Sequence, residues 1–330
     1  MKPFRKLLKH KIICLSIIFV TFIYVNNSST FTKKSAEKPI LLAHRGLAQT
    51  FPMEGITGET NTARRIYEPE HPYLENTIAS MEAAFRLGAD IVEFDIQLTQ
   101  DGKFAVFHDA TLDYRTDGAG RTREYTMEAL KTLDIGYGYT ADCGKTYPFR
   151  GKGIGLMPTL DEVLDYFEGQ AFLIHIKSND PEEGELLAQY LQNIPQSRLD
   201  RLIVYGGDEP IDRLKQNLPN LRVMSKRTMK KALISYMLVG WSGYVPDSMK
   251  NTYLHLPQKY AQVLWGWPHR LIKRMDNANS LFIVVAGDGK WSEGFDNIED
   301  LNQIPLSYTG GIWTNRIDRI GPTVKGESMK

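Results

Sequence analysis

The sequence predicts an α/β fold, a (β/α)₈ TIM barrel, preceded by an N-terminal apolar segment. From residue 40 to about residue 320, apolar strand-like runs alternate with helical stretches. The runs are continuously apolar, which is typical of a parallel sheet covered on both faces. Polar residues gather where several runs end, and a barrel assembles its active site at the carboxyl ends of its strands. An open doubly wound sheet is the alternative, and this distribution of polar residues favours the barrel.

Seven strands can be assigned directly. They are expected at 40–44, 90–98, 172–176, 202–205, 221–225, 281–286 and 311–314. An eighth strand is required between Gly240 and Leu256, where either 243–245 or 253–256 could supply it. Residues 104–107 could form a short extra strand paired with the second one.

Helices are expected between the strands. They are predicted at 77–87, 126–133, 159–167, 181–192, 209–216 and 228–238. Thr77 and Thr159 stand where N-caps belong, and Glu162 follows Thr159 at the spacing of a capping box.

The N-terminus has a basic flank followed by the apolar run 12–25. This pattern is typical of a signal peptide or a signal anchor. The run has 14 residues, whereas a full membrane span needs about 20. No A-x-A-like cleavage site follows, so we favour an uncleaved anchor that exports the catalytic domain. A secreted or periplasmic protein is the alternative if the segment is cleaved.

These patterns divide the chain into four parts. Residues 1–25 form the basic flank and apolar segment, 26–38 a polar linker, 39–322 the barrel domain and 323–330 a tail.

The composition excludes one class of partner. Lys plus Arg is 40 and Asp plus Glu is 39, a net charge of +1. A nucleic-acid-binding protein would show a strongly basic face, so no nucleic-acid partner is expected. Of the two cysteines, Cys14 lies inside the apolar run, so no disulfide with Cys143 is expected.

Glu93 and Asp95 are the first candidates for chemistry. They are two residues apart on an expected strand, so both side chains point to one face. Two adjacent carboxylates repel each other unless a cation lies between them. A hard divalent ion with oxygen ligands is therefore expected here.

Two histidines follow apolar strand-like residues. His44 precedes Arg45 and Gly46, and His108 precedes Asp109, which could orient its ring. Two imidazoles on opposite sides of a phosphate can act as base and acid, and an arginine can donate two hydrogen bonds to the phosphate. The residues therefore point to attack on a phosphate ester.

Long segments interrupt the strand and helix pattern at 47–74 and 100–158. Loops of such length in a compact domain are usually functional or disordered. Both leave the presumed active face, so we expect them to cover a substrate.

The motifs resemble those of the glycerophosphodiester phosphodiesterases, in order and spacing from residue 40 to about 178. The matching pieces are His44-Arg45-Gly46, Glu75-Asn76-Thr77, Gly88-Ala89-Asp90-Ile91-Val92-Glu93-Phe94-Asp95, Thr99-Gln100-Asp101-Gly102, Phe107-His108-Asp109, Thr116-Asp117-Gly118 and Met157-Pro158-Thr159-Leu160-Asp161-Glu162-Val163. Beyond residue 178 the likeness is general, apart from a closing Gly-Ile-Trp-Thr-Asn segment at 311–315.

The resemblance implies a barrel that hydrolyses glycerol-linked phosphodiesters to glycerol 3-phosphate and an alcohol. It also implies a set of site residues: His44 and His108 as general base and general acid, Arg45, Glu75 and Lys177 as substrate-binding residues, and Glu93, Asp95 and His175 as ligands of Mg²⁺ or Ca²⁺.

The sequence departs from the family at three places. The family usually has a third carboxylate ligand where this chain has His175. Because an imidazole favours softer metals, we expect either weaker Mg²⁺ or Ca²⁺ affinity or a transition metal in their place. The loop before Glu75 is longer than usual, which suggests an unusual substrate. The run 113–116 also differs from the family's Asp-Arg-Thr-Thr, with no consequence evident from sequence.

Two other functions remain open. Aromatic residues are frequent in 240–267, and if they flank the active face, a lysophospholipase D-type activity on membrane lysophospholipids is expected. These aromatic residues are Trp241, Tyr244, Tyr260, Trp265 and Trp267. A barrel that binds a phosphodiester without hydrolysing it is the second alternative, motivated by His175. Phospholipase D toxins share the mechanism but lack the Gly-rich and Pro-Thr-Leu pieces.

Overall fold

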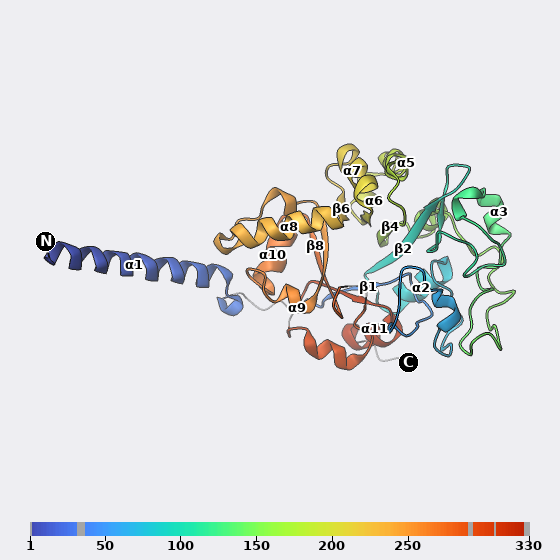
Figure 1. The fold of residues 1–330 in the computed structure, drawn as a ribbon, viewed down its shortest axis with the longest axis horizontal. Helices are drawn as coiled ribbons and strands as arrows, with labels where there is room; N and C mark the ends of the chain where they lie inside the picture. Colours follow the sequence, from blue (N-terminus) through green and yellow to red (C-terminus); the bar gives the residue numbers. More distant parts are fainter. Residues whose placement is uncertain (1, 32–36, 290–292, 307, 327–330) are drawn as a thin grey trace.

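The computed structural model describes residues 2–31, 37–289, 293–306 and 308–326 and contains the predicted barrel (Figure 1). Its parallel strands are β1 (Ile40–Ala43), β2 (Ile91–Leu98), β4 (Ala171–Ile176), β5 (Leu202–Gly206), β6 (Arg222–Ser225), β7 (Tyr253–Pro257), β8 (Leu281–Val285) and β9 (Gly311–Thr314). They pair in the order β6-β5-β4-β2-β1-β9-β8-β7.

The two end strands of this order almost close the cylinder. A single parallel bridge joins Val223 on β6 to Thr252, which precedes β7, and the Thr252 hydroxyl donates to the Val223 carbonyl at 2.8 Å. The eighth strand is thus the second of the two expected candidates. The expected extra strand is β3 (Phe104–Val106), antiparallel to β2.

Helices cover the outside of the barrel. The α-helices of the described chain are α1 (Lys2–Asn27), α2 (Ile78–Arg86), α3 (Met127–Lys131), α4 (Leu160–Tyr166), α5 (Pro181–Gln192), α6 (Gln196–Leu199), α7 (Asp208–Asn217), α8 (Lys226–Val239), α9 (Gln258–Ala261), α10 (His269–Asn277) and α11 (Ile317–Lys325). The six predicted helices are confirmed, and Thr77 and Thr159 cap α2 and α4 in capping boxes. The short helices α6 and α9, and α10 and α11, were not predicted.

Alternation along β2 separates the barrel interior from the helix layer. Ile91 packs with the inward-facing residues of other strands, whereas Val92 and Phe94 pack against the helices. Because side chains alternate, Glu93 and Asp95 share the inward face with Ile91, and both are fully buried. The expectation that they share one face is confirmed.

The two long loops pack on each other at one end of the barrel. Ala63, Ile66 and Leu74 from the first loop share a hydrophobic cluster with Leu112 and Phe149 from the second. The Tyr114 hydroxyl also donates to the Glu59 carbonyl at 3.0 Å. The loops therefore form a small ordered lobe beside β3.

Helix α1 extends away from the barrel as a separate rod (Figure 1). Its segment Lys9–Asn27 is long and apolar enough to cross a membrane and is not buried by the rest of the chain. Within the predicted linker 26–38, residues 32–36 lie outside the described residues, as do residues 327–330 of the predicted tail.

Candidate active site

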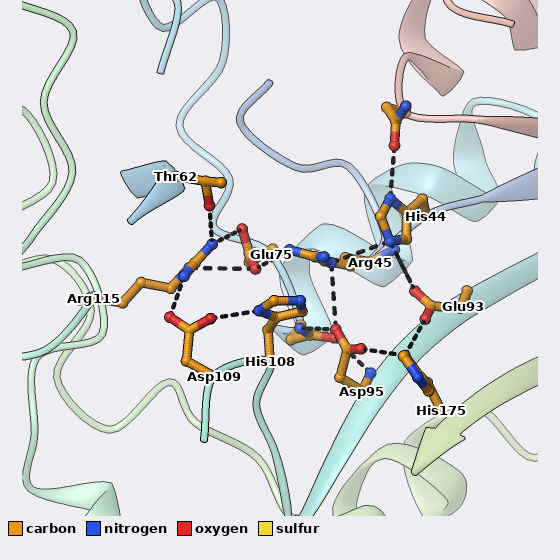
Figure 2. Close-up of polar contacts among 12 residues, drawn as sticks. His44, Arg45, Thr62, Glu75, Glu93, Asp95, His108, Asp109, Arg115 and His175 are labelled. Atoms are coloured by element: carbon orange, nitrogen blue, oxygen red, sulfur yellow. Dashed lines mark hydrogen bonds and ion pairs between the residues drawn. The ribbon is translucent and has the colours of Figure 1, made fainter. Parts of the chain in front are cut away.

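Two carboxylates and an imidazole converge inside the barrel. Glu93 and Asp95 lie on β2, and the β2–β4 register places His175 directly beside Asp95. His175 Nδ1 is 2.9 Å from Asp95 Oδ1 and 3.7 Å from Glu93 Oε1. One candidate ligand atom from each residue lies within 4.8 Å of the others. Figure 2 shows the three side chains facing one another.

The electrostatics of this cluster fit a cation. Burial, followed by the neighbouring Asp95 charge, raises the pKa of Glu93 to about 8. Burial would also raise the pKa of Asp95, but the positive charge of Lys177, followed by His108 and Arg45, outweighs it and holds the pKa well below its usual range. Both carboxylates ionise together readily only when more positive charge is present, and a divalent ion between them would supply it.

Two further side chains fix the orientation of the carboxylates. The Tyr205 hydroxyl donates to Glu93 Oε1 at 2.7 Å. The Asn76 side chain donates to Asp95 Oδ2 at 3.0 Å and accepts from the Asp95 backbone N–H at 3.0 Å. Asn76 has a φ of 59°, a left-handed conformation that asparagine tolerates better than most residues. Such partners hold ligating carboxylates in place.

His44 follows directly after β1 and is held by an amide. Its Nδ1 lies 2.6 Å from the Asn315 Oδ1, and the Asn315 Nδ2 donates to Asp296 Oδ2 at 2.9 Å. Because the amide oxygen only accepts, Nδ1 carries the proton and Nε2 keeps its lone pair. Burial, followed by the Arg45 charge, holds the pKa of His44 well below its usual value.

Arg45 lies at the centre of the site in a strained backbone conformation, with a φ of 57°. Its backbone N–H donates to Glu93 Oε2 at 3.1 Å, and Nη1 donates to Glu75 Oε1 at 2.9 Å. Its Nε lies 3.3 Å from Asp95 Oδ2. A Cβ on the next residue, Gly46, would lie 2.6 Å from the Ser80 hydroxyl, so only glycine fits this turn.

A buried chain of alternating charges links His108 to Arg45. His108 Nδ1 is 2.5 Å from Asp109 Oδ1, and the other Asp109 oxygen pairs with Arg115. Arg115 Nε lies 3.4 Å from Glu75 Oε1, and Glu75 in turn pairs with Arg45 (Figure 2). Burial, followed by the Arg45 charge, lowers the pKa of His108 to about 4. The carboxylate of Asp109 orients the His108 ring and would stabilise an imidazolium.

A cavity of about 650 Å³ opens over these residues. Its polar floor includes His44, Arg45, Glu75, His108, His175 and Lys177. Its walls include apolar side chains from the first long loop, α8, β7, α9 and β8: Phe51, Met53, Ile56, Met229, Leu256, Pro257, Tyr260 and Val285. The first loop therefore lines the cavity, as expected of a segment that covers a substrate.

The structure brings all eight residues implied by the resemblance to one place, since the fully buried Glu93 and Asp95 contact residues of the cavity floor. Of the five aromatic residues named in 240–267, Tyr260 alone is among the lining residues described. Sequence reasoning assigned no role to Tyr205, Arg115, Asn315 or Asp296. Asn315 had a signal as a polar residue at the end of the closing segment, and Arg115 lay in the run 113–116 that departs from the family.

Comparison with known proteins finds a likeness over the segment that carries these eight residues. The model of the glycerophosphoryl diester phosphodiesterase family matches residues 44–206. A glycerophosphodiester phosphodiesterase of Bacillus subtilis is 34% identical over 177 residues, which cover 49% of this chain and 57% of the relative. One from Caldanaerobacter subterraneus is 34% identical over 140 residues, covering 42% of this chain and 45% of the relative. The chain thus spans about half the length of the curated relatives it matches.

Solved structures extend the likeness to the whole barrel. A glycerophosphodiester phosphodiesterase from Agrobacterium tumefaciens aligns with a TM-score of 0.56 and 21% identity, covering 87% of this chain and 99% of that one. A glycerophosphoryl diester phosphodiesterase domain from Mycobacterium tuberculosis aligns with a TM-score of 0.59 and 16% identity, covering 85% and 97%. At these identities the likeness concerns the fold.

Proposed function

We propose that this chain, which belongs to the glycerophosphoryl diester phosphodiesterase family through residues 44–206, hydrolyses glycerophosphodiesters to glycerol 3-phosphate and an alcohol. The observation that carries the proposal is the convergence of a carboxylate pair, one arginine and two oriented histidines at one cavity (Figure 2). This set of groups can bind a phosphodiester and move the two protons that its hydrolysis requires.

The proposed cation ligands are Glu93, Asp95 and His175, whose ligand atoms lie together. A bound divalent cation would neutralise charge on the phosphate oxygens and polarise the phosphoryl group. Two carboxylates and one imidazole suit Mn²⁺ as well as Mg²⁺ or Ca²⁺, because the imidazole is a softer ligand than the carboxylate it replaces.

Arg45 is proposed to bind the phosphate. Its guanidinium is already aligned by Glu75 and Asp95, so its hydrogen-bond fork needs little reorganisation when the substrate enters. Lys177, whose Nζ lies 3.4 Å from Asp95 Oδ1, adds a second positive charge on the cavity floor.

The two histidines are proposed to divide the proton transfers. One imidazole removes a proton from a water molecule whose oxygen bonds to the phosphorus, and the other donates a proton to the alkoxide as its bond to phosphorus breaks and it leaves as the alcohol. His108 is the better carrier of positive charge, because its Nδ1 faces the Asp109 carboxylate whereas that of His44 faces a neutral amide.

Helix α1 is proposed to anchor the chain in a membrane, with the barrel exported. Asn26 and Asn27, at the end of the helix, both donate to the Trp241 carbonyl of the folded domain, at 3.2 and 2.7 Å. These contacts favour an uncleaved anchor, because a cleaved segment would leave them unmade.

A second candidate activity is lysophospholipase D-type cleavage of membrane lysophospholipids. The apolar wall of the cavity favours it, since Phe51, Met229 and Tyr260 could accept an acyl chain that a small water-soluble diester lacks.

The test is to give the full-length chain glycerophosphocholine or lysophosphatidylcholine, with Mg²⁺, Ca²⁺ or Mn²⁺ in turn, and to measure choline release and the phosphorylated product. We expect choline and glycerol 3-phosphate from the first substrate, abolished by chelation. Hydrolysis of glycerophosphocholine alone would exclude the lysophospholipid activity. Binding of both substrates without turnover under any metal would instead support the non-catalytic alternative.

A further inference from the structure

One guanidinium ties the end of α1 to two segments of the barrel domain. Arg274 on α10 donates from Nη2 to the Asn26 carbonyl at 3.0 Å and from Nη1 to the Asn27 side chain at 3.0 Å. The same Nη1 donates to the Tyr236 hydroxyl at 2.8 Å and to the Trp265 carbonyl at 3.4 Å. The end of α1, the end of α8 and the segment around Trp265 therefore meet at one point.

The helix also lies alongside the domain for its last two turns. Phe19 contacts Trp241 edge-to-face, with ring centroids 5.3 Å apart, and Phe19 lies eight residues before Asn27. The helix is thus fixed in orientation, unlike a flexible tether. In Figure 1 the rod joins the barrel next to α8, α9 and α10.

An exposed apolar face borders this junction. Leu238 and Val263 expose 70% and 66% of their surface, far more than a buried core position would allow. The exposed apolar residues of the face, to which we refer as the junction face, are Ile234, Met237, Leu238, Tyr244 and Val263. Helix α8 also carries four basic residues and no acidic one. Apolar side chains beside basic ones are typical of a surface that rests on anionic lipid headgroups.

The position of the domain along α1 gives the reason for such a face. The segment Lys9–Asn27 spans about 28 Å of helix, close to the hydrocarbon core of about 30 Å, so its last residues lie at the bilayer surface. Arg274 holds the domain directly against these last residues, Asn26 and Asn27. Since Trp241 lies beside Phe19, two turns before the helix ends, this part of the domain surface reaches the headgroups and the acyl chains below them.

We propose that the junction face is a membrane-docking surface that rests in the headgroup layer and holds the barrel in one orientation on the bilayer. The proposal rests on the anchoring role of α1 proposed above. Met229 on α8 and Tyr260 on α9 also line the cavity. The apolar wall that could accept the acyl chain of a substrate is therefore built on the same two helical segments that face the lipid.

Site-specific fluorescence in the full-length chain tests the proposal. The background carries Cys14→Ala and Cys143→Ser, since both native thiols are exposed. An environment-sensitive fluorophore is attached through Leu238→Cys, Val263→Cys or, as the matched control, Ile154→Cys. Ile154 is 59% exposed and bridges to Asp134 close to α3, at the end of the molecule opposite α1 (Figure 1). Vesicles of phosphatidylcholine and phosphatidylglycerol carry a nitroxide quencher on the acyl chain.

We expect quenching at positions 238 and 263 to exceed quenching at position 154 by about threefold or more. Ile234→Ser in the Val263→Cys protein should reduce quenching without releasing the chain from the vesicles, because α1 still anchors it. Equal, weak quenching at all three positions in vesicle-bound protein would overturn docking but not the anchor. A chain that does not float with vesicles would overturn both. If the protein is a dimer in detergent and the fluorophore remains buried there, the face contacts a second copy of the chain, and the proposal is overturned.

Hydrolysis of glycerophosphocholine in the same vesicles reports separately on the proposed function. Activity without quenching at positions 238 and 263 would leave the hydrolase proposal intact and reject the docking surface alone.

Discussion

The two halves of the barrel differ in what their strand ends carry. His44 and Arg45 follow β1, and His175 and Lys177 lie at the end of β4, all on the cavity floor, while β2 carries the buried pair Glu93 and Asp95; these residues lie within the segment matched by the family model. Strands β7 and β8 instead contribute Leu256, Pro257, Val285 and one histidine, His255, to the same cavity. The difference teaches that the first half carries the groups proposed for catalysis, whereas the second half shapes the apolar wall and the side next to α1.

The largest difference in kcat is expected between two substitutions, one of a histidine in each half of the barrel. His108→Ala should lower kcat for glycerophosphocholine by about 10²- to 10⁴-fold, because it removes a proton carrier. His255 is the matched control, since it also lines the cavity and burial lowers its pKa to about 4, as for His108. His255→Ala should change kcat by less than about tenfold. Steady-state kinetics measure kcat for both variants. Equal losses of kcat would contradict the proposal that only the first half supplies the proton carriers.

Substitutions of two arginines, one in each half, compare how much each half depends on its ion pairs for stability. Arg115→Met leaves Asp109 and Glu75 buried without their cation, which should cost about 3–5 kcal/mol of unfolding free energy. It should also lower kcat, because Asp109 no longer holds His108 firmly. Arg316→Met breaks pairs with the more exposed Glu70 and Asp318 and should cost roughly 1 kcal/mol.

Urea denaturation of the two arginine variants and the wild type, followed by circular dichroism, measures these costs. A similar cost for Arg115→Met and Arg316→Met would mean that the buried ion chain does not organise the first half.

The third prediction concerns the metal. His175→Glu restores a third carboxylate beside Glu93 and Asp95 and should raise Mg²⁺ affinity by about tenfold, since Mg²⁺ prefers oxygen ligands. Isothermal titration calorimetry with Mg²⁺ and Mn²⁺ gives both affinities. An unchanged ratio of the two would show that residue 175 does not contact the cation, and activity created only in this variant would favour the non-catalytic alternative.

The smallest effect is expected in the second half. Met229→Ser lowers the apolar area of the cavity wall and should reduce kcat/KM for lysophosphatidylcholine by roughly three- to tenfold, the range for a few lost methylene contacts. The value for glycerophosphocholine, which has no acyl chain, should not change. Equal losses on both substrates would indicate that Met229 supports the fold instead of binding an acyl chain.

The sequence predicted features that depend on local periodicity or on strand ends. Glu93 and Asp95 share a face because side chains alternate along any strand, and this holds without knowledge of the neighbours. The eighth strand could not be chosen from sequence, because 243–245 and 253–256 are both short and apolar. In the structure, pairing along β8 determines the choice, since Tyr253 lies beside Leu281.

Features that depend on irregular backbone could not be predicted. Arg115 comes from a loop, so no periodicity shows that it lies buried against Asp109 and Glu75. The support of His44 by Asn315 and Asp296 joins a strand end to a separate loop far along the chain. Helix α10 was missed because its many charged residues mask a narrow apolar stripe of Leu271, Ile272 and Met275.

The most direct test of the central claim is electron paramagnetic resonance of Mn²⁺ bound to the purified chain. We expect a tightly bound ion with a nitrogen coupling from His175, loss of that coupling in His175→Gln, and loss of tight binding in Asp95→Asn. Retention of tight Mn²⁺ binding in Asp95→Asn, or an ion that shows no nitrogen ligand in the wild type, would contradict a cation held by Glu93, Asp95 and His175.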